Sequence, residues 1–336
     1  MMNYALPLFP AWIILSIITT LLGTLLVFLS SWWILTWIGL VMNLISIIPL
    51  ITIKKSSSSS EIAMKYFILQ LIAGTTLLLM PLMSPFTSPL LITLLFTAAS
   101  VLKLGAFPFH IWVPQVMESL SWPMILFMST WQKLAPLGLI LMTSEIINQS
   151  YLIMLGTMTM VMGGLGAWTS TSIKTLFAYS SIAHTGWMLM ISMFSFQLTM
   201  LYFILYIIQM WAFCTLMYSM QNTESDLIPS HPAMPTKPAL TLTLLLLSTS
   251  GIPPFIGFAQ KLMTILILST TPMMVVPIIL MLMASIVMTV TYLFVALNII
   301  PPMFSAPMSK YTAGSPIAAA SIITLMLLIG PLLANI

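Results

Sequence analysis

The chain has 336 residues and a mass of 37.2 kDa; 60% of its residues are hydrophobic, only 4% are charged, and the net charge is +4. Soluble domains carry about 25% charged residues, so this chain has too few charges to cover a surface that faces water. The composition excludes a soluble globular enzyme, a disordered protein and a nucleic-acid reader. The single Cys excludes a disulfide framework and a cysteine-ligated metal cluster, and no glycine-rich phosphate loop occurs.

Long apolar runs without period-two alternation predict membrane-spanning helices. A span needs roughly 20 mostly apolar residues, and lipid admits only helices or closed barrels. We predict an all-α polytopic membrane protein with about eleven spans in a single domain, residues 1–336. The predicted spans cover 12–29, 33–53, 64–80, 90–113, 123–143, 151–168, 176–193, 198–218, 239–269, 273–297 and 317–333. The longest connection, 221–238, gathers several charged residues, and we interpret it as a solvated loop.

Most charged residues fall in loops or near span ends, and Lys65 can either snorkel to the interface or pair with Glu61 one helical turn earlier. Three lysines remain inside apolar runs: Lys103, Lys133 and Lys261. A lysine in mid-span costs roughly 2.5–3.5 kcal/mol on insertion scales, so it predicts a proton or ion pathway. Burial disfavours the ammonium form, which suits lysine to proton transfer. The alternative for each lysine is snorkelling to an interface or a structural ion pair.

Two histidines, His110 and His184, also lie within or beside predicted spans. Imidazole titrates near neutral pH, so both are candidate proton relays. A single histidine in a membrane helix is equally compatible with a hydrogen-bonded core residue, and the sequence leaves the two interpretations open.

Two predicted spans are interrupted by the same pattern, G-x-x-P-F. The first break contains Gly105 and Pro108, and the second contains Gly251, Pro253 and Pro254. Lys103 lies two residues before the first glycine, and Lys261 lies ten residues after the second. Corresponding broken helices are typical of transporters built from repeated halves. An odd number of spans begins between the two breaks, so the two broken helices differ in orientation, as in the inverted repeat that we expect; the pattern alone leaves the inversion open.

Six motifs carry a resemblance to a known family. In order they are "WIGLVMNLISIIPL", "SEIAMKYFILQ", "KLGAFPFHIWVPQVME", "TWQKLAPL", "AYSSIAHTGWM" and "GIPPFIGFAQK". With these the chain resembles, nearly end to end, the chain 2 family of mitochondrial NADH–ubiquinone oxidoreductase (respiratory complex I). The 31 Met and the absence of Arg resemble a product of an animal mitochondrial genome.

The resemblance implies an antiporter-like helix bundle of eleven spans in the membrane arm, in the mitochondrial inner membrane. Its partners would be other membrane-arm subunits, including neighbouring antiporter-like subunits, and bilayer lipids, with no nucleic acid. NADH, FMN, iron–sulfur clusters and ubiquinone would be bound by other subunits, with no cofactor or metal in this chain. By resemblance, Lys133 is the family's central lysine and Lys103 and Lys261 are the lysines of the first and second broken helices. His184 matches a histidine near the water path, and His110 follows the first break.

One departure from the family pattern affects this path. The pattern W-[VMI]-G-L-E places a glutamate where this chain has Val41, and in the family that glutamate is proposed to pair with the lysine that matches Lys103. Attraction across ~4 Å at an effective dielectric near 20 is about 4 kcal/mol. Its loss shifts Lys103 toward the neutral form unless another subunit supplies an acid. A second, minor departure is Gln115, where many relatives have Glu.

Three functional hypotheses follow. The first is a subunit that offers a lysine and water pathway for protons, coupled to electron transfer in other subunits. The second is a structural spacer of the membrane arm without a complete channel, which Val41 favours. The third is a stand-alone cation/proton antiporter component, which would purify alone.

Overall fold

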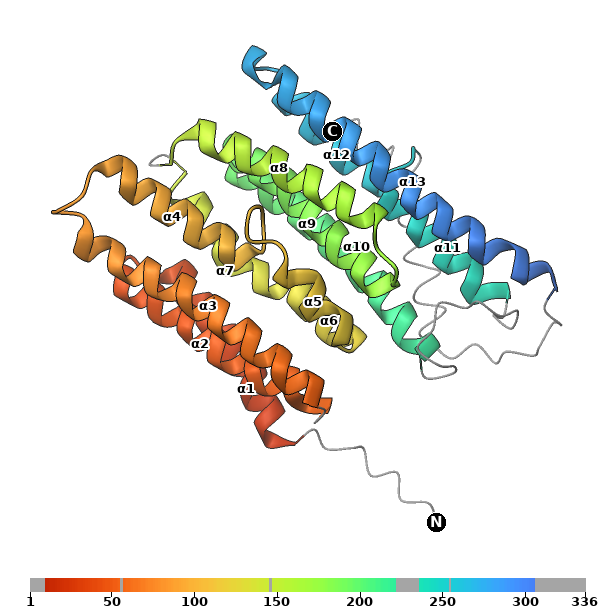
Figure 1. Cartoon of the computed structure of the whole chain (residues 1–336), viewed down its shortest axis with the longest axis horizontal. Helices are drawn as coiled ribbons and strands as arrows, with labels where there is room; N and C mark the ends of the chain where they lie inside the picture. The colour runs from red at the N-terminus through yellow and green to blue at the C-terminus, as the bar shows by residue number, and fades with distance from the viewer. Residues whose placement is uncertain (1–9, 55–56, 145–146, 222–235, 254, 306–336) are drawn as a thin grey trace. The chain divides into compact units, whose positions relative to one another are not determined.

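The computed structural model describes residues 10–54, 57–144, 147–221, 236–253 and 255–305, and every regular element in these ranges is a helix (Figure 1). The predicted all-helical fold is therefore confirmed. The elements are α1 (Ala11–Leu29), α2 (Trp33–Ile51), η1 (Thr52–Lys54), α3 (Ser57–Met83), α4 (Pro89–Leu104), α5 (Trp112–Ser119), α6 (Trp122–Ser129), α7 (Trp131–Met142), α8 (Gln149–Trp168), α9 (Ile173–Ile191), α10 (Phe196–Gln221), α11 (Thr236–Ser250), α12 (Ile256–Leu268), η2 (Pro272–Met274) and α13 (Val275–Ser305).

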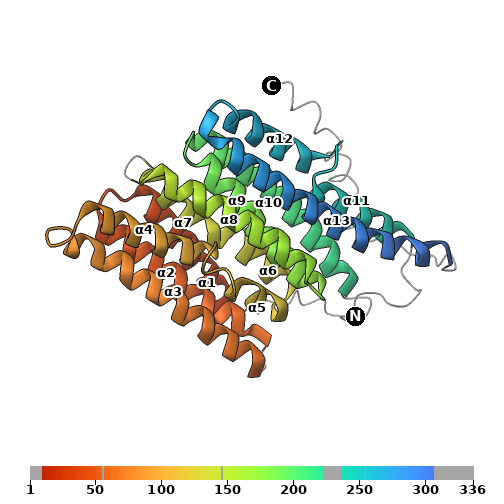
Figure 2. The same ribbon diagram turned by 45° about the horizontal axis from the view of Figure 1, so that its top comes forward.

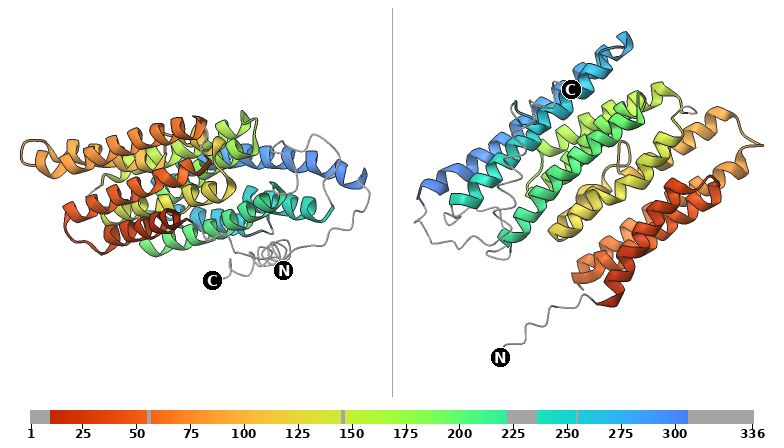
Figure 3. Two further views of the ribbon diagram at one scale, coloured as in Figure 1. Left: turned by 90° about the horizontal axis from the view of Figure 1, so that it is seen from below. Right: turned by 180° about the vertical axis from the view of Figure 1, so that it is seen from behind.

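The helices form two compact units, residues 1–104 with 132–146 and residues 105–131 with 147–336. In the first unit, α2 packs between α1 and α3, and α3 also contacts α4. In the second unit, α8 packs on α9 and α13, and Figure 2 shows α8 and α13 side by side. There α13 also runs along α11, as the blue and teal ribbons of Figure 3 show. The sequence predicts a single domain. Because the structure describes each of the two units separately, this stays a prediction.

Seven helical stretches are long and apolar enough to cross a membrane, judged by length and composition within the described residues. Large apolar side chains are exposed along α1 and α13, which is the surface that lipid requires. Each predicted span between 12 and 297 corresponds to one helix or to two consecutive helices. The predicted span 317–333 lies outside the described residues, as do Pro254 and most of the loop 221–238.

Both spans that the sequence predicts to be broken are broken, and a third span has an interruption that was not predicted. The span predicted at 90–113 is helical only to Leu104, because Gly105 adopts φ +68° and the next helix, α5, begins at Trp112. The span predicted at 239–269 is broken near Gly251, as expected, into the two helices α11 and α12. The span predicted at 123–143 is also two helices, interrupted at Thr130, whose backbone angles are φ −112° and ψ −73°.

Glycines allow α8 and α9 to approach closely. A Cβ added to Gly186 on α9 would lie 2.6 Å from the Oγ1 of Thr159 and 2.8 Å from the carbonyl oxygen of Gly156, both on α8. A Cβ added to Gly163 on α8 would lie 2.8 Å from the backbone nitrogen of Ala183 on α9. Small residues at both surfaces are how membrane helices gain close van der Waals contact.

Candidate functional site: buried lysines at interrupted helices

Lys103 lies in the last turn of α4 and its side chain is only 8% exposed. Its Nζ donates a 3.5 Å hydrogen bond to the backbone carbonyl of Gln70 on α3. In return, the Gln70 side-chain amide donates to the Lys103 carbonyl at 3.3 Å. That carbonyl is among the last four of its helix, which have no partner within the helix. Gln70 therefore provides the hydrogen-bond donor that this carbonyl at the end of α4 needs, and it also fixes the position of the lysine.

A row of polar residues continues from Gln70 along one face of α3. Tyr66, four residues before Gln70, donates from its hydroxyl to the side-chain oxygen of Gln132 at 3.4 Å. Gln132 on α7 donates in turn to the side-chain oxygen of Asn43 on α2 at 3.1 Å. Tyr66 and Asn43 are buried. The first unit thus contains a connected polar group reaching α2, α3 and α7, with Lys103 bound one turn further along α3.

Lys133 directly follows Gln132 on α7 and is 4% exposed. It lies between the interruption at Thr130 and Pro136, which stands within the helix. Proline has no N–H, so Pro136 cannot donate to the carbonyl of Gln132, four residues earlier. Lys133 therefore lies between a residue whose backbone angles depart from those of a regular helix and a proline that cannot donate a backbone hydrogen bond.

A further proline explains a tryptophan contact in the same unit. Pro81 within α3 cannot donate to the carbonyl of Leu77. The indole nitrogen of Trp33 on α2 donates to that carbonyl at 2.8 Å, and Trp37 donates to the carbonyl of Gly74 at 2.9 Å. These two hydrogen bonds hold α2 against α3 beside Gly74, where an added Cβ would lie 4.0 Å from the Nζ of Lys103.

We expect Trp33→Phe to lower the free energy of unfolding by about 1–3 kcal/mol, because the Leu77 carbonyl loses its donor while it stays covered. The measurement is the thermal unfolding of the purified protein within its native assembly. Trp32→Phe is the matched control, since Trp32 is 72% exposed and should change little. Equal stability of both variants would contradict this explanation of the contact.

Val41 lies half-buried on α2, one turn after Trp37. The described part of the chain contains two acidic residues, Glu61 and Glu118, and both are exposed. Glu61 pairs with Lys65 at 2.6 Å, which confirms the predicted i, i+4 pair. Within the described residues, therefore, Lys103 contacts backbone carbonyl oxygen rather than a carboxylate.

The second unit holds Lys261 at the other interrupted helix. The helix α11 ends at Ser250, Gly251 adopts φ +84°, and α12 begins at Ile256 after Pro253. The Nζ of Lys261 donates to the Ser250 carbonyl at 2.6 Å. A Cβ at Gly251 would also lie 2.6 Å from that nitrogen, so the glycine leaves room for the lysine. An ammonium group at a helix C-terminus is favoured by the helix dipole.

The two predicted histidines also lie in the second unit. His184 on α9 is 6% exposed, and its Nδ1 is 2.8 Å from the hydroxyl oxygen of Tyr202 on α10. The ring of Tyr206, one turn further along α10, lies 4.9 Å from the His184 ring, centroid to centroid. His110 lies buried in the segment between α4 and α5, and its ring stacks on that of Phe107.

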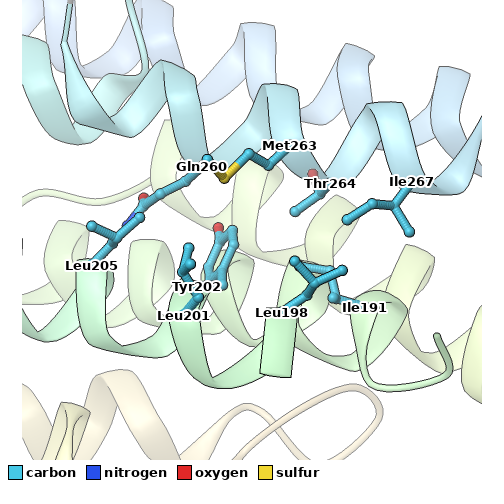
Figure 4. A pocket seen from close by; sticks show the side chains of 9 residues that line it. All are labelled: Ile191, Leu198, Leu201, Tyr202, Leu205, Gln260, Met263, Thr264 and Ile267. Carbon is cyan, nitrogen blue, oxygen red and sulfur yellow. The ribbon is translucent and has the colours of Figure 1, made fainter. Parts of the chain in front are cut away.

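A cavity opens between α10 and α12 in the same unit (Figure 4). Most of its lining is apolar, but Tyr202, Gln260 and Thr264 contribute polar groups. Sequence reasoning did not single out Tyr202, Gln260, Gln70 or Gln132. In the first unit, Tyr66 and Gln70 lie four residues apart within an apolar run, and this spacing could have indicated a buried polar face on α3. No group of three or more metal-ligating side chains occurs among the described residues.

Comparisons with known proteins agree on one family. The profile described as NADH:quinone oxidoreductase/Mrp antiporter, TM, matches residues 80–289. The curated NADH-ubiquinone oxidoreductase chain 2 of Crocidura suaveolens gueldenstaedtii is 35% identical over 282 residues, which are 80% of each chain. The chain of the same name from Salmo salar is 39% identical over 251 residues, 71% of each chain.

Two solved structures share the fold. A chain of respiratory complex I from Thermus thermophilus, with bound aureothin, matches with a TM-score of 0.79 at 23% identity, covering 96% of this chain and 78% of that chain. A chain of the Mrp complex from a Dietzia species matches with a TM-score of 0.77 at 16% identity, covering 95% and 75%. The antiporter-like bundle expected from the sequence is therefore the fold of this chain.

Proposed function

The chain belongs to the NADH-ubiquinone oxidoreductase chain 2 family of antiporter-like membrane subunits, and from this premise we propose that it is a membrane-arm subunit of a proton-translocating NADH:ubiquinone oxidoreductase in the mitochondrial inner membrane. NADH oxidation and quinone reduction take place in other subunits, which hold FMN, iron–sulfur clusters and ubiquinone. The contribution of this chain is a path for protons through the membrane. Its partners are the neighbouring membrane-arm subunits and lipid.

The burial of Lys103 and Lys133 carries the proposal. Both ammonium-bearing side chains are withdrawn from solvent in mostly apolar helices, and each is the only charged residue of its helix. A buried lysine in a membrane helix is costly, so it marks a functional path by default. Lys261 and His184 extend the set of groups that exchange protons, and His110 follows the first break. A change of charge in a neighbouring subunit would shift the protonation of these groups in turn.

A structural spacer remains the second candidate function, because Val41 replaces the family's glutamate. The described interior offers Lys103 no carboxylate, and the switch that such a pair provides would have to come from another subunit. A spacer would hold the membrane arm together and transmit charge or strain without completing a channel. The two functions differ in what they require of Lys103.

We expect Lys103→Met to lower the number of protons pumped per electron, measured with the purified complex in sealed vesicles, because methionine keeps an unbranched side chain but binds no proton. NADH oxidation by the other subunits should persist. Lys65→Met is the control, since Lys65 is 52% exposed and pairs with Glu61 at the surface. An unchanged number of protons pumped per electron in both variants would favour the structural spacer.

Purification tests the assembly directly. Solubilised in mild detergent, the chain should be recovered together with flavin and iron–sulfur proteins in one large complex. Recovery of the chain alone, with intact helical content, would overturn the proposal in favour of a stand-alone antiporter component.

A further inference from the structure

The interface between α10 and α12 buries two glutamines whose amides have no protein partner. Gln209 on α10 and Gln260 on α12 are each 1% exposed. Neither the nitrogen nor the oxygen of either side-chain amide has a hydrogen-bond partner within the described part of the chain. Buried polar groups in proteins are nearly always hydrogen-bonded, to protein or to ordered water. Each of these amides therefore requires a partner that the helices themselves do not provide.

The antiparallel packing of the two helices shows where that partner can lie. Gln209 approaches Gly257, with its Nε2 3.3 Å from where a Cβ would be. One turn further along α12, Gln260 lines the cavity, together with Tyr202 and Thr264. Figure 4 shows Gln260 extending from α12 toward α10, while the Tyr202 hydroxyl points back toward α12. Gln260 is thus the buried amide that faces open space.

The cavity has the size and the polar groups that one water molecule needs. The space open to the centre of a water molecule is about 10 Å³, at the lower limit of what a cavity needs to hold one water. A buried water typically makes about three hydrogen bonds. The Gln260 amide, the Tyr202 hydroxyl and the Thr264 hydroxyl are the three candidates. Thr264 donates to the Lys261 carbonyl at 2.6 Å, which leaves its oxygen free to accept.

Tyr202 connects this cavity to His184 in either tautomer of the histidine. If Nδ1 accepts, the tyrosine donates to it and its oxygen can accept from water; if Nδ1 donates, the tyrosine hydroxyl donates to water. We propose that Gln260 is a positioning residue that holds a buried water molecule against Tyr202, so that hydrogen bonding extends from His184 on α9 to α12, the helix of Lys261. The role in proton movement rests on the proposed function; the water site itself does not.

The first test is a structure of the unaltered assembled complex at a resolution that shows ordered water. We expect density within hydrogen-bond distance of both the Gln260 amide and the Tyr202 hydroxyl. A dry contact, with the Gln260 amide bonded directly to Gln209 or to Tyr202, would overturn the water site. So would an acyl chain that fills the cavity.

The second test uses variants of the assembled complex. Gln260→Met removes both amide atoms at similar length and should lose the water density and lower the protons pumped per electron, while NADH oxidation persists. Gln260→Glu keeps an oxygen that binds water and should retain the density and restore the ratio. Met263→Leu, which alters the same cavity without touching a polar group, should change neither. A normal pumping ratio in a Gln260→Met complex that has lost its water would overturn the link to His184, whereas the proposed function itself would fail only if the lysine variants pumped normally.

Discussion

Replacing Lys133 with alanine is expected to slow proton transfer through this chain by about 100-fold or more, because removal of a positioned proton-exchanging group typically costs at least that factor. Lys133 is 4% exposed and stands between a helix interruption and a helix proline. Water alone has to carry the proton past that point in the variant. The number of protons pumped per electron should fall by the full number that this subunit contributes. The ratio is measured in vesicles, with an uncoupler as the reference.

Stability separates this result from a structural effect. A mid-span lysine costs roughly 2.5–3.5 kcal/mol on insertion, so alanine should leave the thermal midpoint of the complex unchanged or raised. Lys133→Arg provides the companion variant. Arginine keeps the charge but does not give up its proton in proteins, so it should pump as poorly as the alanine variant. Full stoichiometry in both variants would show that Lys133 carries no proton.

The second large effect is expected at the contact between α8 and α9. Gly186→Leu should prevent accumulation of the assembled complex, because the new side chain would begin only 2.6 Å from Thr159 and 2.8 Å from backbone atoms of α8. Backbone atoms cannot turn aside as a side-chain end can, so the helices must separate. Gly186→Ala should already cost about 1–3 kcal/mol, the usual range for overpacking.

A glycine with open space nearby supplies the control. A Cβ at Gly74 in α3 would meet its nearest neighbours at 3.9 and 4.0 Å, which is ordinary contact. Gly74→Ala should therefore keep or slightly raise stability, since alanine is the better helix former by roughly 0.5–1 kcal/mol. Native gels and thermal unfolding of the solubilised complex measure both changes. A Gly186→Leu complex that assembles and melts like the parent would contradict the close packing.

The helices could be predicted from the sequence because lipid admits only helices or closed barrels, and long apolar runs without period-two alternation favour helices. The Lys65–Glu61 pair followed from spacing on one helix. The interruption at Thr130 could not be predicted in the same way, because no glycine or proline occupies the position itself. The roles of the buried lysines and histidines stay predictions.

The contacts between helices could not be predicted from the sequence. Trp33 reaches the carbonyl that Pro81 leaves free only because α2 packs on α3 at one particular register. The same holds for Gln70, whose spacing from Tyr66 was visible while its partner on α4 was not. Gln260 stands beside Lys261 in the chain, yet the two side chains face different neighbours. A pattern of residue types does not specify which face of a helix meets which partner.

The bond between Lys261 and the end of α11 has a mechanical consequence. An ammonium group binds a helix C-terminus more strongly than a neutral amine does, because only the charged group is attracted by the dipole. Departure of a proton from Lys261 would therefore loosen the Ser250 carbonyl and the chain around Gly251. If Lys261 exchanges protons as proposed, the joint between α11 and α12 would be stiffer when Lys261 is protonated and looser when it is neutral.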